Sequence, residues 1–139
     1  MLRAQDLVLD LGCGSGAYGQ WIRSTKSVRL ISVDWAFPAL LSARERLDSG
    51  GTCVCADINR LPFKPSIFDA FYSIDTLGHV RDSDPALDEC RRVLKNGGHF
   101  FLHSECSDYR NRLPDRELIR LLGYDAIALE DGHVGLRES

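Results

Sequence analysis

The stretch Val8-Leu9-Asp10-Leu11-Gly12-Cys13-Gly14-Ser15-Gly16 decides the fold of this 139-residue chain. Its first half is a short apolar run that stops at glycines, which predicts a buried β-strand over residues 7–11. The three alternating glycines let the backbone turn sharply and let a ligand lie directly against it. Residues 18–24 then indicate a helix, whose free N–H groups face the same place. The stretch therefore predicts a strand, a ligand-binding turn and a helix in succession.

The rest of the chain continues this alternation. Further strands are predicted over residues 28–33, 52–56, 68–74 and 99–103, and helices over residues 38–47 and 85–95. Such an order implies right-handed crossovers and a mostly parallel sheet with helices on both faces. The predicted fold class is therefore α/β, with a Rossmann-like doubly wound sheet, and the length suits a single domain over residues 1–139.

Acidic residues stand where the first three strands end. Asp10 lies near the end of the first strand, Asp34 ends the second, and Asp57 follows the third. An ionised Asp34 can accept two hydrogen bonds from a ribose diol, and Asp57 can accept one from an exocyclic amine such as that of adenine. Their charge suits an ammonium or sulfonium ligand better than a pyrophosphate. Each carboxylate alone could be a solvated strand-end cap, but together with the glycine turn they predict an adenosine-type cofactor.

Several motifs resemble those of class I S-adenosylmethionine-dependent methyltransferases. They are the first-strand motif at residues 8–16, the acidic end at 32–34, the segment 56–63 with 66–69, and the helix and turn at 87–98. The resemblance covers about residues 6–104 and is closest to the broad subgroup that includes the ubiquinone and menaquinone biosynthesis methyltransferases. It implies transfer of a methyl group from S-adenosylmethionine to a small-molecule acceptor at oxygen, nitrogen or carbon, with S-adenosylhomocysteine as the product.

The same resemblance implies roles for cofactor-binding residues, carried over position by position. The methionine portion of the cofactor is lined by Gly12, Cys13 and Gly14, and its ammonium group is approached by Asp10. The ribose is held by Asp34, and the adenine is contacted by Trp35, Asp57 and Ile58. The methionine and sulfonium end is faced by Ser73 and Ile74. Plain core packing is the alternative for Trp35.

Catalysis is harder to assign, because an activated methyl group needs mainly positioning and a dry site. His79 follows the fourth strand near the expected mouth of the active site, so it is the candidate base or substrate contact. The alternative is that His79 has a structural role. His103 and Glu105, at the end of the fifth strand, could line the substrate side, although capping the strand end is the preferred interpretation.

The chain departs from the resemblance at both ends. Members of the family usually carry helices before the first motif, whereas few residues precede it here, so a second copy or a partner chain is expected to complete the lid. Residues 115–122 indicate a helix and residues 124–129 a sixth strand. Residues 131–137 form either a seventh strand after an Asp131-Gly132 turn or the approach to a helix that the chain lacks. The second interpretation is preferred, which leaves the final hairpin missing.

Two other functions fit parts of the pattern. Gly12 to Ala17 satisfies the G-x-G-x-x-A pattern of NAD(P)-dependent oxidoreductases. Asp10, Asp57 and the segment 61–63 count against that function. A non-catalytic subunit or pseudoenzyme that binds the cofactor, or has lost it, is the other alternative.

Composition excludes further classes. A net charge of −3 argues against a generic basic surface for nucleic acid. No apolar run approaches the roughly 20 residues that a membrane span needs, and no signal peptide is evident, so a cytoplasmic protein is expected. The five cysteines are an odd number and indicate free thiols. Cys53 and Cys55 would need two more ligands to hold zinc, so no metal site is predicted.

Overall fold

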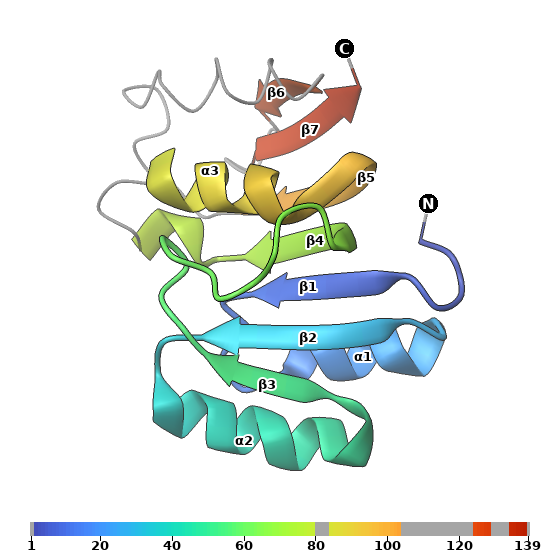
Figure 1. The fold of residues 1–139 in the computed structure, drawn as a ribbon, viewed down its shortest axis with the longest axis vertical. Helices are drawn as coiled ribbons and strands as arrows, with labels where there is room; N and C mark the ends of the chain where they lie inside the picture. The colour runs from blue at the N-terminus through green and yellow to red at the C-terminus, as the bar shows by residue number, and fades with distance from the viewer. Residues whose placement is uncertain (1, 80–83, 104–123, 129–133, 139) are drawn as a thin grey trace.

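The computed structural model describes residues 2–79, 84–103, 124–128 and 134–138. Five parallel strands form the central sheet in the order β3-β2-β1-β4-β5 (Figure 1). The strands are β1 (Leu7–Leu11), β2 (Arg29–Asp34), β3 (Thr52–Cys55), β4 (Phe68–Ile74) and β5 (Leu94–His103). The helices are α1 (Ala17–Thr25), α2 (Phe37–Leu47) and α3 (Asp84–Val93), with short 3-10 turns η1 (Asp48–Gly50) and η2 (Leu77–His79). The prediction of a doubly wound α/β sheet is confirmed.

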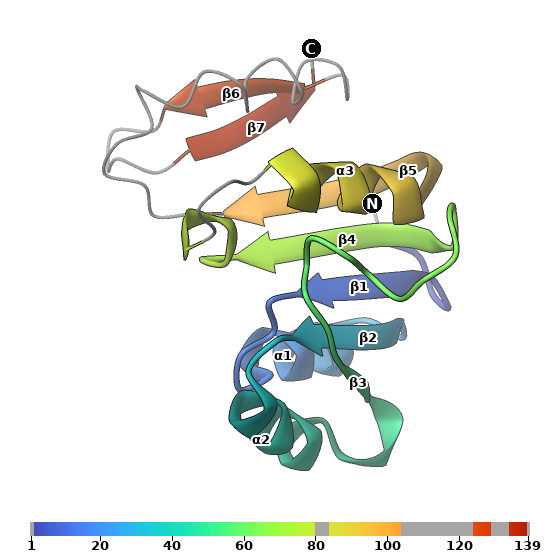
Figure 2. The same cartoon turned by 60° about the vertical axis from the view of Figure 1, so that its left-hand side comes forward.

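Apolar side chains pack on both faces of the sheet because successive strand residues point to opposite sides. Leu9 and Leu11 of β1 face a core that includes Val93 of α3, whereas Val8 faces a second core that includes Leu47 of α2. Figure 2 shows α3 on one face of the sheet and α1 on the opposite face. The helices therefore cover both faces, as the continuous apolar strands predict.

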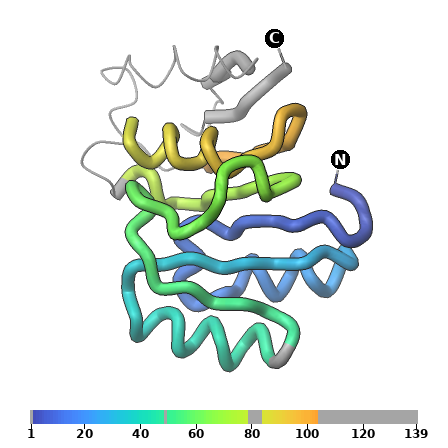
Figure 3. The backbone as a smooth tube through the Cα atoms, in the orientation of Figure 1, coloured from blue at the N-terminus to red at the C-terminus, as the bar shows by residue number. Residues whose placement is uncertain are grey.

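The carboxyl ends of β1, β2 and β4 lie along one edge of the sheet, and the N-terminus lies near the opposite edge (Figure 3). The order of strands reverses at β1, because the chain runs outward from β1 to β3 and then returns to β4 on the other side. In sheets of this kind a ligand binds outside the carboxyl ends at that point of reversal.

The junction of α3 and β5 differs from the prediction. The helix ends at Val93 and not at Lys95, and Leu94 already pairs with Phe68 of β4. The carbonyl of Val93 accepts a hydrogen bond from the N–H of Ile67 at 2.9 Å, so the last turn is bound to the start of β4. Sheet pairing therefore overrides the helical preference of the sequence here, and the register shifts between Phe68 and Ala70.

The prediction that the final hairpin is missing is wrong. Strands β6 (Tyr124–Ala128) and β7 (Val134–Glu138) pair antiparallel in a small sheet of their own, and β7 contacts β5. Residues such as Gly135 and Glu138 have weak strand preference, so the pairing with β6 supplies what the local sequence does not. The predicted helix at 115–122 and the Asp131-Gly132 turn lie outside the described residues.

Candidate functional site

A cleft of about 640 Å³ lies at the carboxyl edge of the sheet. That volume falls within the range of small-molecule sites. Its lining residues are Gly12, Asp34, Trp35, Asp57, Ile58, Asn59, Ile74, Asp75 and Thr76. The structure thus brings six of the predicted cofactor residues into one cavity, from four different strand ends.

The glycine turn needs its glycines for two separate reasons. Gly12, Gly14 and Gly16 have φ angles of 76°, 51° and 79°, which side chains other than that of glycine rarely adopt. A Cβ at Gly12 would lie 2.0 Å from Oγ1 of Thr76, so the backbone passes directly beneath the segment after β4. A Cβ at Gly14 would meet nothing within 4 Å. The turn is therefore packed at Gly12 and open at Gly14.

Asp34 ties the turn to the end of β2. Its Oδ2 accepts a hydrogen bond from the N–H of Gly14 at 2.9 Å, and its Oδ1 accepts one from the N–H of Ala36 at 2.9 Å. A carboxylate has about four lone-pair positions, so both oxygens keep capacity for further donors. Asp34 is thus fixed in place and can still accept hydrogen bonds from a ligand in the cleft.

Asp57 and its neighbours form the opposite side of the cleft. Oδ1 of Asp57 accepts hydrogen bonds from the backbone N–H of Asn59 at 2.9 Å and from its side-chain Nδ2 at 3.0 Å. Ile58 is buried, with 8% of its surface exposed, whereas Trp35 is 80% exposed. Core packing for Trp35 is therefore wrong. The two apolar side chains offer flat surface to a ligand, and Asp57 offers a polar edge.

Four predicted residues lie outside the cleft lining: Gly14, in the turn described above, and three buried residues. The hydroxyl of Ser73 is buried and donates to the carbonyl of Leu11 at 3.0 Å, which joins β4 to β1. Cys13 is buried, and its thiol lies 3.6 Å from the carbonyl oxygen of Gly14. Asp10 is buried behind the turn. The structure places all three as supports beneath the cleft, and direct contact with a cofactor stays a prediction for them.

Asp10 is an unusual group for a protein interior. It is 3% exposed, and its Oδ2 has no hydrogen-bond partner among the described residues. Burial raises the pKa of Asp10 to about 6, the hydroxyls of Tyr72 and Ser32 offset part of that rise, and Asp34 adds to it. A buried carboxylate of this kind would gain from a positive charge placed nearby.

Three residues that line the cleft were not predicted from the sequence: Asn59, Asp75 and Thr76. Asp75 directly follows β4, and Asp57 likewise comes soon after the end of β3. An acidic residue just after a strand is therefore the sequence signal by which Asp75 could have been predicted. Thr76 carries no comparable signal, because its contact with Gly12 depends on the fold. His79 ends η2, and its side chain lies outside what the structure describes, so its role stays a prediction.

Other site types are not seen among the described residues. In the described ranges no group of three metal-binding side chains occurs, and no helix is long and apolar enough to span a membrane. The four described cysteines are free, as predicted, with Cys13 and Cys90 buried and Cys55 exposed.

The doubly wound sheet, the glycine turn and the carboxylates at three strand ends define a protein of the class that binds nucleoside cofactors. Comparison with known families makes this specific. The family described as methyltransferase domain matches residues 9–102, and the chain belongs to that family. Which subgroup it belongs to, including the ubiquinone and menaquinone enzymes, stays a prediction.

Individual relatives support the same assignment. A Mus musculus protein named "Probable tRNA methyltransferase 9B" is 32% identical over 109 residues, which is 76% of this chain and 23% of that protein. Haemonchus contortus phosphoethanolamine N-methyltransferase 2, solved with S-adenosyl-L-methionine, matches with a TM-score of 0.81 and 20% identity, covering 94% of this chain and 36% of that chain. A Haloferax volcanii complex of the Trm112 methyltransferase activator with a methyltransferase matches with a TM-score of 0.79 and 24% identity, covering 91% and 64%.

The chain spans between 22% and 37% of the length of the curated relatives it matches, so the match concerns one part of each of them and not their whole length.

Proposed function

We propose that this chain binds S-adenosylmethionine in the cleft and transfers its methyl group to a small-molecule acceptor. One observation carries the proposal: Gly12 of the glycine turn, Asp34 and Asp57, from three consecutive strand ends, line one cavity. The bound cofactor would supply a methyl group activated by the sulfonium. The protein's part is then to hold the reactants in line and to exclude water.

The residues of the cleft fit this cofactor. Asp34 would accept hydrogen bonds from the ribose hydroxyls, and Asp57 would accept one from the adenine amine. Trp35 and Ile58 would flank the ring. The open space beside Gly14 admits a ligand against the backbone. Asp10, buried without a partner for Oδ2 among the described residues, would stabilise the methionine ammonium through the turn or through water.

The acceptor is proposed to be a small molecule because the chain carries a net charge of −3, which gives no general attraction to nucleic acid. The phosphoethanolamine enzyme among the structural relatives supports this class. The relative named for tRNA supports an RNA acceptor instead, so tRNA belongs in the test. The Trm112 complex supports a second chain as a requirement for full activity.

Isothermal titration calorimetry tests the proposal. We expect S-adenosylhomocysteine to bind with a dissociation constant on the order of micromolar, and NADH not to bind. The opposite pattern would overturn the assignment in favour of an oxidoreductase.

An S-adenosylhomocysteine-release assay against phosphoethanolamine, phenols, amines, quinols and tRNA then identifies the acceptor. Because a methyltransferase with a similar structure occurs in a complex with the Trm112 activator, we expect weak turnover by the chain alone. Binding of cofactor with no turnover on any acceptor, even with a partner chain added, would favour the non-catalytic alternative.

A further inference from the structure

A histidine and an aspartate meet where β4 and β5 end. Nδ1 of His103 lies 3.0 Å from Oδ1 of Asp75. The backbone N–H of Asp75 donates to the carbonyl of His103 at 2.8 Å, and Ile74 pairs with His103 in the sheet. Two backbone constraints and one side-chain contact therefore fix the pair.

Asp75 brings the pair to the edge of the cofactor cleft, whose lining includes Asp75 and not His103. Asp75 and Ile74 both line that cleft, together with Gly12 and Thr76. Asp75 has a φ angle of 56°, which costs free energy in a residue with a side chain. Strain of this kind persists where surrounding structure holds it, and it often marks functional positions. The pair thus stands at the strand-four edge of the site, away from the adenosine side formed by Asp34 and Asp57.

The geometry points to a chemical role. We propose that His103 is the general base for the methyl acceptor, and that Asp75 is its positioning residue. When Nδ1 of a neutral histidine donates its proton to a carboxylate, Nε2 carries the lone pair that accepts a proton. This inference rests on the proposed function, and it deepens it by naming the acceptor class: a hydroxyl, phenol or ammonium group that still holds its proton near neutral pH.

The proposed step balances in atoms and electrons. The acceptor oxygen or nitrogen forms a bond to the methyl carbon, and the electron pair of the carbon–sulfur bond stays with sulfur. The proton of the acceptor passes to Nε2 of His103, and the resulting imidazolium is stabilised by Asp75. Solvent then takes the proton before the next turnover. No oxidant, reductant or metal is needed.

Nitrogen-15 NMR of the histidine rings in the full chain tests the pair without any acceptor, with the His103 signals assigned by comparison with His103→Gln. We expect the Nδ1–H form of His103 in the parent and a shift toward the Nε2–H form in Asp75→Asn. The matched control is His99→Gln, four residues earlier on the same face of β5, which should leave the His103 signals unchanged. A dominant Nε2–H form in the parent, or no change in Asp75→Asn, would overturn the proposal.

Methyl transfer to two phenols tests the base itself. At pH 8.5, 4-nitrophenol is ionised and 4-methylphenol is not. We expect His103→Gln to slow transfer to 4-methylphenol roughly 100-fold and to leave 4-nitrophenol nearly unchanged, with His99→Gln like the parent. Equal loss with both phenols would overturn the base role. If the parent methylates neither phenol, the NMR result alone decides. Failure of the parent to bind S-adenosylhomocysteine would overturn the proposed function and leave the NMR result standing.

Discussion

At the scale of one residue, Asp10, which is proposed to take part in cofactor binding, lowers the stability of the folded protein. Its carboxylate is buried behind the glycine turn, and its pKa is raised from 3.8 to about 6. The folded protein therefore binds the proton of Asp10 more tightly than the unfolded chain does. Between pH 4 and pH 6 this group makes the folded state less stable as the pH rises, and above pH 6 the loss is complete. Two pKa units correspond to a cost of roughly 3 kcal/mol.

Asp10→Asn should remove that cost in the ligand-free protein. We expect the variant to exceed the parent in free energy of unfolding by about 1–3 kcal/mol at pH 7.5, with the advantage shrinking as the pH is lowered toward 4. Urea unfolding of both proteins across this pH range measures it, and the difference between them cancels the other titrating groups. Asp10→Asn is also expected to weaken S-adenosylhomocysteine binding. A variant that is less stable than the parent at pH 7.5 would contradict the account.

Asp34 is the residue whose loss should most directly weaken cofactor binding. Asp34→Ala removes charged hydrogen-bond acceptors for the ribose and releases the N–H groups of Gly14 and Ala36. We expect a loss of about 1.5–3 kcal/mol in binding free energy. Asp57→Ala is the matched comparison and should lose less, because a single hydrogen bond is at stake. Calorimetry with S-adenosylhomocysteine measures both, and unchanged binding by Asp34→Ala would show that the ribose contact is misplaced.

The sequence predicted those residues whose place depends only on where a strand ends. Asp34, Asp57 and the glycines follow directly from an apolar run and its stop, so they could be found without a structure. Thr76 could not, because what brings it against Gly12 is the pairing of β4 with β1. The pairing of Asp75 with His103 likewise depends on the register of β4 against β5.

At the scale of elements, α3 holds the segment that follows β3. The Arg92 guanidinium donates to the carbonyls of Phe63 at 2.7 Å and Leu61 at 2.9 Å. Glu89 pairs with Arg92 at 2.6 Å and accepts a hydrogen bond from the N–H of Leu61 at 2.7 Å. Proximity to Arg92 lowers the pKa of Glu89. One turn of α3 therefore fixes the chain only a few residues after Asp57.

Arg92→Met should loosen this segment while keeping the aliphatic part of the side chain. The carbonyls of Leu61 and Phe63 lose their donor, although water can reach the partly exposed site and replace some of the bonding. We expect a Tm lower by a few degrees and weaker S-adenosylhomocysteine binding through Asp57. Arg91→Met, on the exposed side of the same helix, is the control. Equal effects of the two substitutions would show that the helix surface, and not this clamp, is responsible.

Strands and helices with a strong local sequence pattern were predicted well, whereas those with a weak pattern were not. The strands of the parallel sheet are apolar runs, and Pro38 stands at the start of α2 as expected. The end of α3 was misplaced because Leu94 has a strand partner in Phe68 that local sequence cannot show. Residues 131–137 fit either a seventh strand or the approach to a helix, and the pairing of β6 with β7 decides for a strand over residues 134–138.

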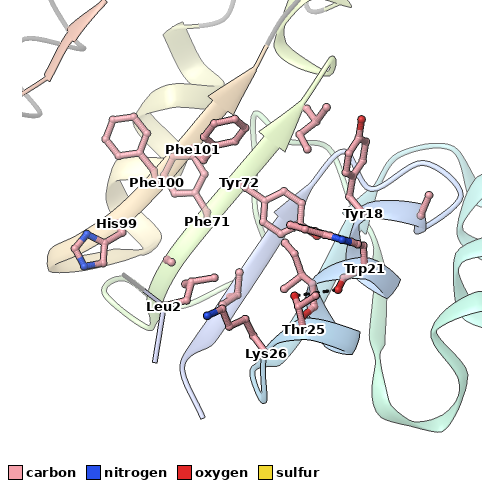
Figure 4. A pocket seen from close by; sticks show the side chains of 15 residues that line it. Leu2, Tyr18, Trp21, Thr25, Lys26, Phe71, Tyr72, His99, Phe100 and Phe101 are labelled. Carbon is pink, nitrogen blue, oxygen red and sulfur yellow. Dashed lines mark hydrogen bonds between the residues drawn. The ribbon is translucent and has the colours of Figure 1, made fainter. Parts of the chain in front are cut away.

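At the scale of the whole molecule, the sheet has a second large cavity, which shares Ile74 with the lining of the cofactor cleft. A groove of about 930 Å³ runs between α1 and β5, over β1 and β4. Figure 4 shows Tyr18 and Trp21 of α1 on one side, Phe101 of β5 on the other, and Tyr72 between them. Tyr18, Trp21 and Phe101 are 52%, 63% and 57% exposed. These side chains stay exposed among the described residues, and parallel sheets are normally covered on both faces, so we expect a partner to cover this surface.

The sequence did not locate the groove. Trp35 and Phe37, which do not line it, are also exposed, at 80% and 60%. The groove could not be found from the sequence, because its residues come from three strands and one helix and only the fold brings them together. Local sequence patterns predict which strand or helix a residue belongs to. Which part of a sheet face stays uncovered depends instead on how the helices pack on the assembled sheet.

A second copy of this chain suits the groove because the same face carries both a projecting Trp21 and an apolar hollow. In a twofold pair each Trp21 would enter the hollow of the other copy, as a self-complementary interface requires. The three aromatic side chains would supply on the order of 300 Å² of apolar contact per copy, enough for the centre of an interface of about 800 Å² per partner.

Light scattering across concentration should therefore show the parent chain associating into dimers. Trp21→Glu places a charge in the interface and should give monomers, because an unpaired buried charge is costly. Trp35→Glu is the matched control: it alters an equally large exposed indole at the cofactor cleft and should leave the dimer intact. Both variants should keep the parent's circular dichroism spectrum, since both side chains are exposed. If the parent is monomeric at about 100 μM, a concentration above the dissociation constants of weak interfaces, the groove is not a self-association surface. Monomers from Trp35→Glu alone would place the interface at the cleft, where it would compete with the cofactor.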